Sequence, residues 1–578
     1  MKPMPMTVLD WAIVAGYGLF ALAVGAIYSR RAGRSTNEYF ISSRNLPWWI
    51  IGTSMVATTF AADTPLAVSG IVAKDGIAGN WLWWNLALAH LLAVFFFSRL
   101  WRRAGIITDL ELIELRYSGR PAAALRGFRA LYEGVLTNGI IMGWVLLAMA
   151  KLLGVLFDFP KIWALGLCLV LALAYTVLSG FWGVVVTDLV QFAIAMVGAI
   201  ALAIIAVGDH GGLSEVVSGI EPETLALFPR HGGELWTAFL VYLGINWWAS
   251  KHVDGGGYLS QRMFAARSER DSQLGTLWFA VAHYALRPWP WILVGLVALK
   301  AHGGEDWFSG NAALGIKGDP ELGYAQMIKD CLPVGLRGLM VASFFAAFMS
   351  TIDTHLNWGG SYLVNDLYRR FLARDREERH YVLAARVCAV LLMLVGVGVA
   401  LLMETIAGGW KLMWQLTAGI GGVYVLRWFW WRINAWSEIA AWTASSIATL
   451  VLNLGFPEMD FGPRLSITAL FSTGCWLIVT LLTAPVAEER LVEFYRRVRP
   501  RSPGWRPIAE RAGLVADRSG IGGDLLGWAL GTAVVFGALF GIGKLLLGEP
   551  MLGALGLGAA AAGGICIWRL LRDQEPAR

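Results

Sequence analysis

Long apolar stretches recur along the whole sequence, separated by short polar or charged connections. We distinguish about fifteen of them, each of roughly 20 residues, which is long enough for a helix to cross the apolar core of a bilayer. The chain of 578 residues is 57% hydrophobic and only 15% charged, and this composition excludes a soluble protein. The sequence therefore predicts an all-α membrane protein with about fifteen transmembrane helices.

Basic residues occur mainly in alternate connections. Lys and Arg gather after predicted spans 1, 3, 7, 9, 11 and 13 and after the last one, whereas the other connections are acidic or uncharged. Basic connections face the cytoplasm, so we expect the N-terminus outside and the C-terminus inside, in a plasma (bacterial inner) membrane. These basic connections account for the net charge of +6, so the charge does not require a nucleic-acid partner. The expected surroundings of the chain are the lipid bilayer. We expect no signal peptide and no fused soluble domain.

Helix breakers interrupt two of the predicted spans. Span 2, near residues 46–72, has Asp63-Thr64-Pro65 at its middle, and span 7, near residues 235–253, is followed by Gly residues at 255–257. Pro65 removes a backbone donor and disfavours helix at Thr64. A break at membrane depth is tolerated where the freed backbone groups line a cavity or bind something. Each broken span opens a group of five spans, in opposite orientations, and this is the pattern of an inverted-repeat secondary transporter.

This pattern predicts five segments. They are an N-terminal extra helix with a cytoplasmic loop (1–45), a first five-helix repeat (46–207) in which spans 5 and 6 meet near residues 181–183, an extracellular loop (208–234), a second, inverted five-helix repeat (235–432) and C-terminal extra helices with a basic cytoplasmic loop (433–578).

Span 9, near residues 334–368, contains an unusually polar segment with Ser350 and Thr351 in succession. On a helix these two side chains lie about 100° apart, and Ala347 lies one turn earlier. The two hydroxyls and the Ala347 carbonyl can therefore converge on one point, and three uncharged oxygens at membrane depth suit Na⁺. The alternative is that both hydroxyls bond back to the carbonyls of Ala346 and Ala347 within the helix.

Four stretches resemble the sodium:solute symporter family, which includes proline, pantothenate and sugar symporters. They are GTSMVATTFAADTPLAVSG in span 2, SGFWGVVVTDLVQFAIAMVG in spans 5 and 6, QRMFAARSERDSQLG after span 7 and AAFMSTIDTHLN in span 9. They occur in the family's order over most of the chain. The resemblance implies the LeuT-type fold, a 5+5 inverted repeat with extra helices, and Na⁺ as the coupling ion.

The resemblance also implies where Na⁺ binds, namely between spans 2 and 9. The implied ligands are the backbone carbonyls of Ala57, Phe60 and Ala347 and the hydroxyls of Ser350 and Thr351. Asp188 lies near the inner end of span 6, where a carboxylate is costly unless it is solvated or paired. We expect it on the Na⁺ release path, and the alternative is a helix-end residue in water. Asp353 is either close to the ion or a structural bridge.

The substrate site is expected beside the two breaks, near the bilayer midplane. The candidate lining residues are Asp63, Thr64, Trp83, Asn85, Trp247, Lys251 and Tyr284. The sugar branch of the family has a Glu-Trp pair where this chain has Trp83 and Trp84, and this difference argues against a hexose. Asp63 and Lys251 instead favour a charged or zwitterionic solute such as an amino acid. If the two pair with each other or with other protein groups, a neutral sugar or polyol is the better substrate.

Three function classes compete. The leading one is Na⁺-coupled symport, in which one Na⁺ moving down about 100 mV releases roughly 2.3 kcal/mol. The second is an intramembrane enzyme, but the sequence has no HExxH motif, no GxSxG motif on a plausible helix and no paired-carboxylate signature. The third is a transporter-like membrane sensor, which would need an output domain that we do not expect here. We therefore expect a transporter and not an enzyme.

Overall fold

The computed structural model describes residues 6–32, 44–302, 318–514 and 521–573. Helices build these ranges, as the sequence predicts, and none of the described residues belongs to a strand. Eight helices in these ranges are long and apolar enough to cross a membrane, or nine if one bent pair counts as a single span. Some of the remaining predicted spans correspond to helices that are divided into shorter pieces, and others to continuous helices such as Ala435–Gly455 that are not among these eight, so the number fifteen stays a prediction.

The helices follow the order of the predicted spans. The first group comprises α3 (Trp48–Thr59), α4 (Asp63–Asp75), the run from η2 (Ile77–Asn80) to α7 (Ser98–Ala104), the run from α9 (Gly119–Leu131) to α10 (Asn138–Phe157) and α11 (Lys161–Asp209). The second group comprises α14 (Glu234–Val241), η5 (Tyr242–Asn246), α15 (Trp247–Ala249), α16 (Tyr258–Ala265), α17 (Glu269–Val281), η6 (Ala282–Leu286), α18 (Pro288–His302), α20 with η8 (Leu336–Leu372), α21 (Glu378–Leu402), α22 (Ile406–Leu416) and α23 (Ile420–Phe429).

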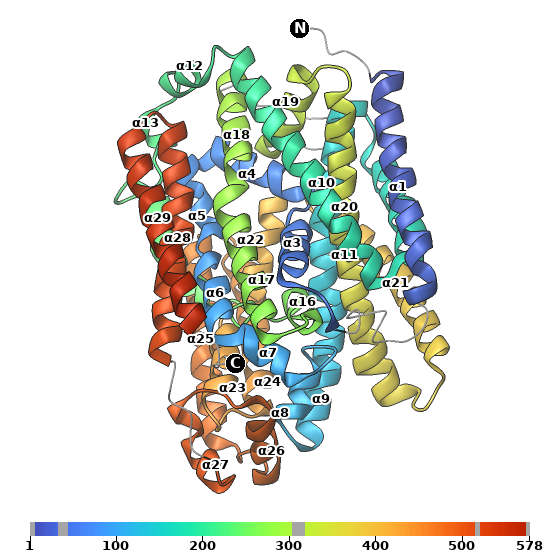
Figure 1. Ribbon diagram of the computed structural model, residues 1–578, viewed down its shortest axis with the longest axis vertical. Helices are drawn as coiled ribbons and strands as arrows, with labels where there is room; N and C mark the ends of the chain where they lie inside the picture. Colours follow the sequence, from blue (N-terminus) through green and yellow to red (C-terminus); the bar gives the residue numbers. More distant parts are fainter. Residues whose placement is uncertain (1–5, 33–43, 303–317, 515–520, 574–578) are drawn as a thin grey trace.

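Further helices surround or connect these two groups. They are α1 (Val8–Ala32), α8 (Glu111–Arg116), α12 (Leu213–Ser218), α13 (Pro222–Leu225), α19 (Gly323–Cys331), α24 (Ala435–Gly455), α25 (Phe461–Leu482), α26 (Glu488–Val498), α27 (Arg506–Arg511), α28 (Ile521–Leu546) and α29 (Pro550–Asp573). In Figure 1, α12 and α13, which belong to the acidic connection, lie at one end of the molecule, whereas α8, α9, α26 and α27 lie at the other.

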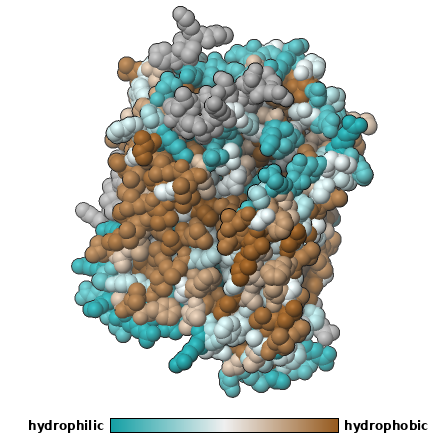
Figure 2. Space-filling model, turned by 180° about the vertical axis from the view of Figure 1, so that it is seen from behind, coloured by the Kyte–Doolittle hydropathy of each residue, from teal (hydrophilic) through white to brown (hydrophobic). Residues whose placement is uncertain are grey.

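The outer surface has a broad apolar region between hydrophilic ends, as Figure 2 shows for one face. Large hydrophobic side chains on α21, α25 and α29 contribute to the exposed surface; examples are Leu402, Leu482 and Leu555. Soluble monomers rarely expose contiguous apolar patches of more than about a few hundred Å², so a region this broad would be unfavourable in water. The chain is an integral membrane protein, and we expect this surface to face the bilayer.

The first broken helix consists of α3 and α4, which are bent by 57° relative to each other. The α-helix ends at Thr59, and Phe60 leaves the helical region with φ −95° and ψ 69°. Pro65 lies in the first turn of α4, where its missing N–H costs nothing, whereas a continuous helix would force its ring against the Ala61 carbonyl. The break is therefore encoded locally, and it directs the end of α3 toward α20.

The helix α20 lies at the centre of the protein. It contacts α1, α3, α10, α11 and α21, and nearly all of its side chains are buried. Its polar segment consequently faces protein on every side instead of lipid.

Two details differ from the sequence prediction. The helical assignment of α11 continues through residues 181–183, where we expected one span to end and the next to begin. The second break also starts earlier than expected, because α15 ends at Ala249 and helix resumes only at Tyr258 in α16. Gly421 of α23 packs on this irregular backbone, where a Cβ atom would lie 2.0 Å from the carbonyl oxygen of Trp248.

The hairpin of α28 and α29 packs along one side of the bundle, drawn in red in Figure 1. Two indole hydrogen bonds cross the interface in opposite directions. Trp289 of α18 donates to the Leu539 carbonyl at 2.8 Å, and Trp528 of α28 donates to the Leu88 carbonyl of α6 (Leu86–Leu92) at 2.9 Å. Gly543 leaves room for the ring of Trp289, which a Cβ atom there would overlap.

Candidate functional site

The end of α3 meets the middle of α20. The Thr351 hydroxyl donates to the Thr58 carbonyl at 2.9 Å, and Phe60 and Ala347 line the same narrow cleft. The Ser350 hydroxyl also bonds outside its own helix, to Asp188. The alternative in which both hydroxyls bond back within α20 is therefore wrong. The structure therefore places the end of α3 against α20, with Thr351 bonded to Thr58 and with Phe60 beside Ala347.

Asp188 of α11 lies directly beside this interface. Its two carboxylate oxygens each accept a hydrogen bond of 2.5 Å, one from the Ser350 hydroxyl and one from the Ser54 hydroxyl. The guanidinium of Arg262 lies 3.8 Å from Asp188 and donates to the hydroxyls of Thr58 and Thr354. Asp188 is fully buried, so it is not a helix-end residue in water. Its contact with Ser350 connects it to the candidate ion site.

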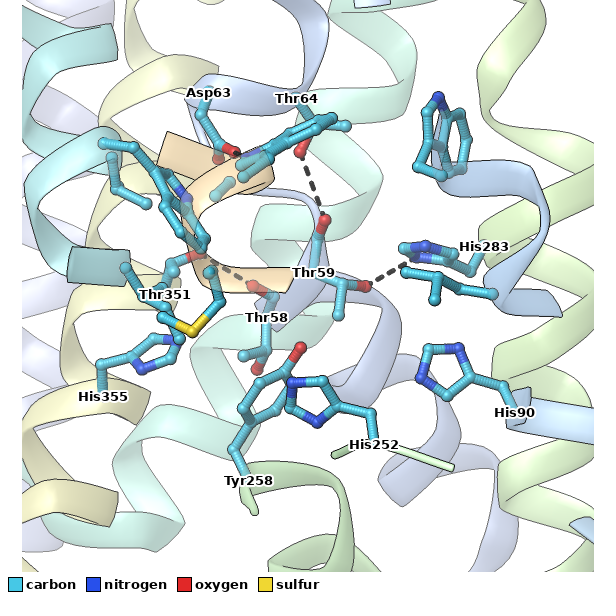
Figure 3. Close-up of a pocket in the computed structure, with 18 of the residues that line it drawn as sticks. Thr58, Thr59, Asp63, Thr64, His90, His252, Tyr258, His283, Thr351 and His355 are labelled. Atoms are coloured by element: carbon cyan, nitrogen blue, oxygen red, sulfur yellow. Dashed lines mark hydrogen bonds between the residues drawn. The ribbon is translucent and has the colours of Figure 1, made fainter. Parts of the chain in front are cut away.

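A cavity of about 160 Å³ lies next to the break (Figure 3). One water needs only about 10–15 Å³ by the same kind of measure, so the cavity can accommodate a small solute. The lining residues come from both of the predicted five-span groups. They are Thr58, Thr59, Ala61, Asp63, Thr64, Trp83, Leu86, His90, Ile141, Trp144, Val145, His252, Tyr258, His283, Tyr284, Arg287, Thr351, His355, Trp410, Met413 and Trp414.

Four predicted substrate residues line this cavity, namely Asp63, Thr64, Trp83 and Tyr284. Asp63 begins α4, and one of its oxygens accepts a hydrogen bond of 3.1 Å from the Trp410 indole. The other oxygen is buried and has no hydrogen-bond partner among the described residues. The cavity therefore offers a ligand one unused carboxylate oxygen.

The other three predicted substrate residues lie outside the cavity lining. Asn85 donates to the carbonyls of Trp81 and Leu82, and its amide oxygen accepts a bond from Asn246. Trp247 stacks on Trp528, with ring centroids 5.7 Å apart.

Lys251 is the third of these residues, and it neither reaches Asp63 nor faces the cavity. Its ammonium lies 3.4 Å from the Thr137 hydroxyl, 3.9 Å from the Glu133 carboxylate and 5.6 Å from the centre of the Trp358 ring. The sequence interpretation in which Lys251 pairs with Asp63 is wrong.

Several cavity residues were not predicted from the sequence. Four of the eight His converge on it although they are far apart in the chain: His90, His252, His283 and His355 (Figure 3). His90 contacts the Tyr284 hydroxyl at 2.7 Å, and His355 contacts the Asn138 amide at 2.6 Å. Histidine inside apolar spans was the available signal, but nothing local indicated that the four would meet.

A buried ion cluster lies near the start of α22, away from the cavity. The Lys151 ammonium is 2.5 Å from carboxylate oxygens of both Asp319 and Glu321. The Glu321 carboxylate also accepts the backbone N–H groups of Ile406 and Ala407, each at 2.9 Å. These bonds satisfy the free N–H groups at the start of α22 and fix its position.

Comparisons with known proteins agree with this architecture. A profile described as "SSF: Sodium:solute symporter family" matches residues 39–442. A sodium/glucose cotransporter of Vibrio parahaemolyticus is 26% identical over 502 residues, which cover 81% of this chain and 89% of that protein. A sodium/myo-inositol cotransporter of Bos taurus is 24% identical over 557 residues, covering 83% and 74%. The solved structure of a Na⁺-coupled sialic acid symporter matches with a TM-score of 0.67 and 20% identity, covering 83% and 99%.

A broken helix beside a buried cavity, within a bundle that follows an inverted-repeat pattern, defines a secondary transporter of the LeuT-type fold. The chain belongs to the sodium:solute symporter family and uses Na⁺ as its coupling ion.

Proposed function

We propose that this symporter takes up a small, neutral, polyhydroxylated solute, a sugar or a polyol, together with Na⁺. The observation that carries the proposal is the lining of the cavity beside the break. Neutral hydrogen-bonding groups dominate its polar part: the hydroxyls of Thr58, Thr59, Thr64, Tyr258 and Tyr284 and the imidazoles of His90, His252, His283 and His355. Such groups exchange hydrogen bonds with solute hydroxyls without introducing charge.

Aromatic rings supply the apolar part of the lining. Trp83 and Tyr284 stack with centroids 5.8 Å apart, and Trp410 and Trp414 lie on α22. Flat aromatic surfaces suit the C–H faces of a sugar or cyclitol ring. The names of the similar cotransporters, which refer to glucose and myo-inositol, support the same substrate class.

Among the described residues that line the cavity, none offers a free cation to a solute carboxylate, and this argues against an amino acid. Lys251 lies outside the lining, and Arg287, the only Lys or Arg among the lining residues, donates from all three guanidinium nitrogens to protein groups. The expectation of a zwitterionic solute needed two charged partners, and only Asp63 is available.

A second candidate is a solute that carries an amine, and the unused oxygen of Asp63 favours it. A buried carboxylate with a free oxygen attracts an ammonium group, because charge-assisted hydrogen bonds are about twice as strong as neutral ones. A hydroxyl can also donate to this oxygen, so the neutral solute remains the first proposal.

For the ion, we propose that Na⁺ binds between α3 and α20. The ligands are the carbonyls of Ala57, Phe60 and Ala347 and the hydroxyls of Ser350 and Thr351, and the Na⁺ ion released inward passes Asp188. The opposed placement of these residues supports the site, as does the contact between Ser350 and Asp188.

We also propose a bacterial inner-membrane location with the N-terminus outside and the C-terminus inside. The positive-inside rule supports this orientation, because the basic helix α9 lies at the end of the molecule opposite the acidic connection.

Uptake into proteoliposomes tests the function. An inward Na⁺ gradient should drive accumulation of one or more of D-glucose, D-mannose and myo-inositol, and an equal K⁺ gradient should not. D-Glucosamine tests the amine candidate, and L-proline tests the amino acid. If Na⁺ drives uptake of L-proline and of none of the neutral solutes, the proposed substrate class is wrong.

A further inference from the structure

The break between α3 and α4 leaves several backbone carbonyls without a helical partner. The last carbonyls of α3 belong to Val56, Ala57, Thr58 and Thr59, and of these only Val56 still accepts the helical N–H bond from one turn further on, that of Phe60 at 2.9 Å. Phe60 adds a fifth carbonyl, because the chain leaves the helix there. Which of these oxygens are taken by protein donors decides which remain for an ion.

Arg287 of the α17–α18 segment takes two of the five. Its Nη1 donates to the Val56 carbonyl at 3.0 Å, and its Nη2 donates to the Thr59 carbonyl at 2.8 Å. The guanidinium also lies over the rings of Phe60 and Trp291, at 5.7 and 5.4 Å. Arg287 is fully buried, and a buried cation needs such partners to offset its lost hydration. The C-terminal end of a helix is the favourable place for it.

Thr351 takes a third carbonyl, that of Thr58. The Ala57 carbonyl accepts only the backbone N–H of Phe60, and the Phe60 carbonyl accepts no hydrogen bond among the described residues. A carbonyl has two lone pairs, so both oxygens keep free capacity. The two carbonyls left without a side-chain donor are the two that we propose as Na⁺ ligands.

The same arginine also borders the substrate cavity. Arg287 and His283 both line it, and the Nδ1 atom of His283 contacts Nη2 of Arg287 and lies 2.9 Å from the Thr59 hydroxyl. A solute that bonds to His283 or Thr59 therefore acts on the group that holds the end of α3. Arg287 itself has no unengaged nitrogen for the solute, because Nε donates to the His283 carbonyl at 3.3 Å.

We propose that Arg287 is a positioning residue that holds the end of α3 so that the Ala57 and Phe60 carbonyls face the ion, and that it thereby couples the ion site to the substrate cavity. This inference rests on the proposed Na⁺ site. Coupling of this kind is reciprocal, so a solute that orders the Arg287–His283–Thr59 contacts raises Na⁺ affinity, and Na⁺ raises solute affinity by the same factor.

The test uses the purified full-length protein and Na⁺ alone as the probe. Thermal unfolding is followed while NaCl replaces choline chloride at constant ionic strength, in the wild type and in Arg287→Gln and Arg287→Lys. We expect the Na⁺ midpoint of Arg287→Gln to rise about tenfold or more, a size typical of coupling between sites. Arg287→Lys keeps the positive charge but loses the guanidinium that donates to two carbonyls at once. Its Na⁺ midpoint should therefore lie between those of the wild type and Arg287→Gln.

Arg116→Gln is the matched control. Arg116 is also fully buried, donates to the carbonyls of Arg427, Trp430 and Trp431 at the end of α23, and lies 4.6 Å from the centre of the Trp505 ring. Its loss should lower the unfolding temperature in choline without moving the Na⁺ midpoint.

An unchanged Na⁺ midpoint in Arg287→Gln, with a normal wild-type response, overturns the positioning role and leaves the proposed function standing. If Arg287→Gln does not fold, Arg287→Lys decides, because a wild-type midpoint there also overturns the role. A wild-type protein with no Na⁺ response overturns the ion site and this inference together.

Discussion

Replacing Ser350 by Ala separates two roles of one hydroxyl. Its oxygen donates to Asp188 at 2.5 Å, and it is also a proposed Na⁺ ligand. The first role is present without Na⁺. A hydrogen bond to a charged group contributes about 1.5–3 kcal/mol, so we expect the free energy of unfolding in choline to fall by that amount. Asp188 keeps its bond from Ser54, so the variant should still fold.

The second role appears only when Na⁺ binds. At a Na⁺ concentration 100 times the wild-type Kd, binding adds about 2.7 kcal/mol of stability. If the variant binds about tenfold more weakly, the gain at the same concentration falls to about 1.4 kcal/mol. The assay is thermal unfolding in NaCl and in choline chloride at equal ionic strength, and the quantity compared is the difference between the two salts.

Ser472→Ala is the control for this experiment. Ser472 is buried and donates one hydrogen bond of 3.0 Å to the Ala441 carbonyl, in the peripheral helices α25 and α24. It should lose stability equally in both salts. A Ser350→Ala protein that keeps the full wild-type gain from Na⁺ would refute the reasoning, whatever its stability in choline.

Three further predictions concern buried charges. Asp188→Asn should slow Na⁺-driven uptake in proteoliposomes while the protein stays folded, because the Na⁺ release path loses its carboxylate; an unchanged rate and Na⁺ dependence would leave Asp188 a structural role. Asp63→Asn should raise the KM of D-glucosamine far more than that of a neutral sugar if both are carried, since only the amine loses a charge-assisted bond; equal changes would contradict this. Lys151→Met should destabilise the protein by about 3–5 kcal/mol, because two carboxylates lose their shared cation, and a wild-type unfolding temperature would count against it.

Local rules explain why part of the site could be predicted from the sequence. Pro65 excludes a continuous helix by its own geometry, and the spacing of Ala347, Ser350 and Thr351 follows from the helical repeat. Both features need only a few neighbouring residues. The family resemblance then predicted that these two segments face each other, and the bond from Thr351 to Thr58 agrees with that placement.

The rest of the site depends on partners that are distant in the chain. Arg287 binds Val56 and Thr59 more than two hundred positions away, and although its place within an apolar stretch is unusual, no local pattern shows which groups it binds. Lys251 was expected in the cavity because it follows a break, but its partners Glu133 and Thr137 lie on another helix. Charge pairing of this kind is determined by tertiary packing, which the sequence does not display.

The C-terminal hairpin restricts how the bundle can move. The Trp528 hydrogen bond connects α28 to α6, in the first predicted five-helix repeat, and the Trp289 hydrogen bond connects α28 to α18, in the second predicted repeat. Sliding of α6 past α18 would break at least one of these two hydrogen bonds. It would also displace the Trp289 ring from the space beside Gly543. We therefore expect the two helices and the hairpin to move as one rigid unit during transport, with the lipid around α29 rearranging each time that unit moves.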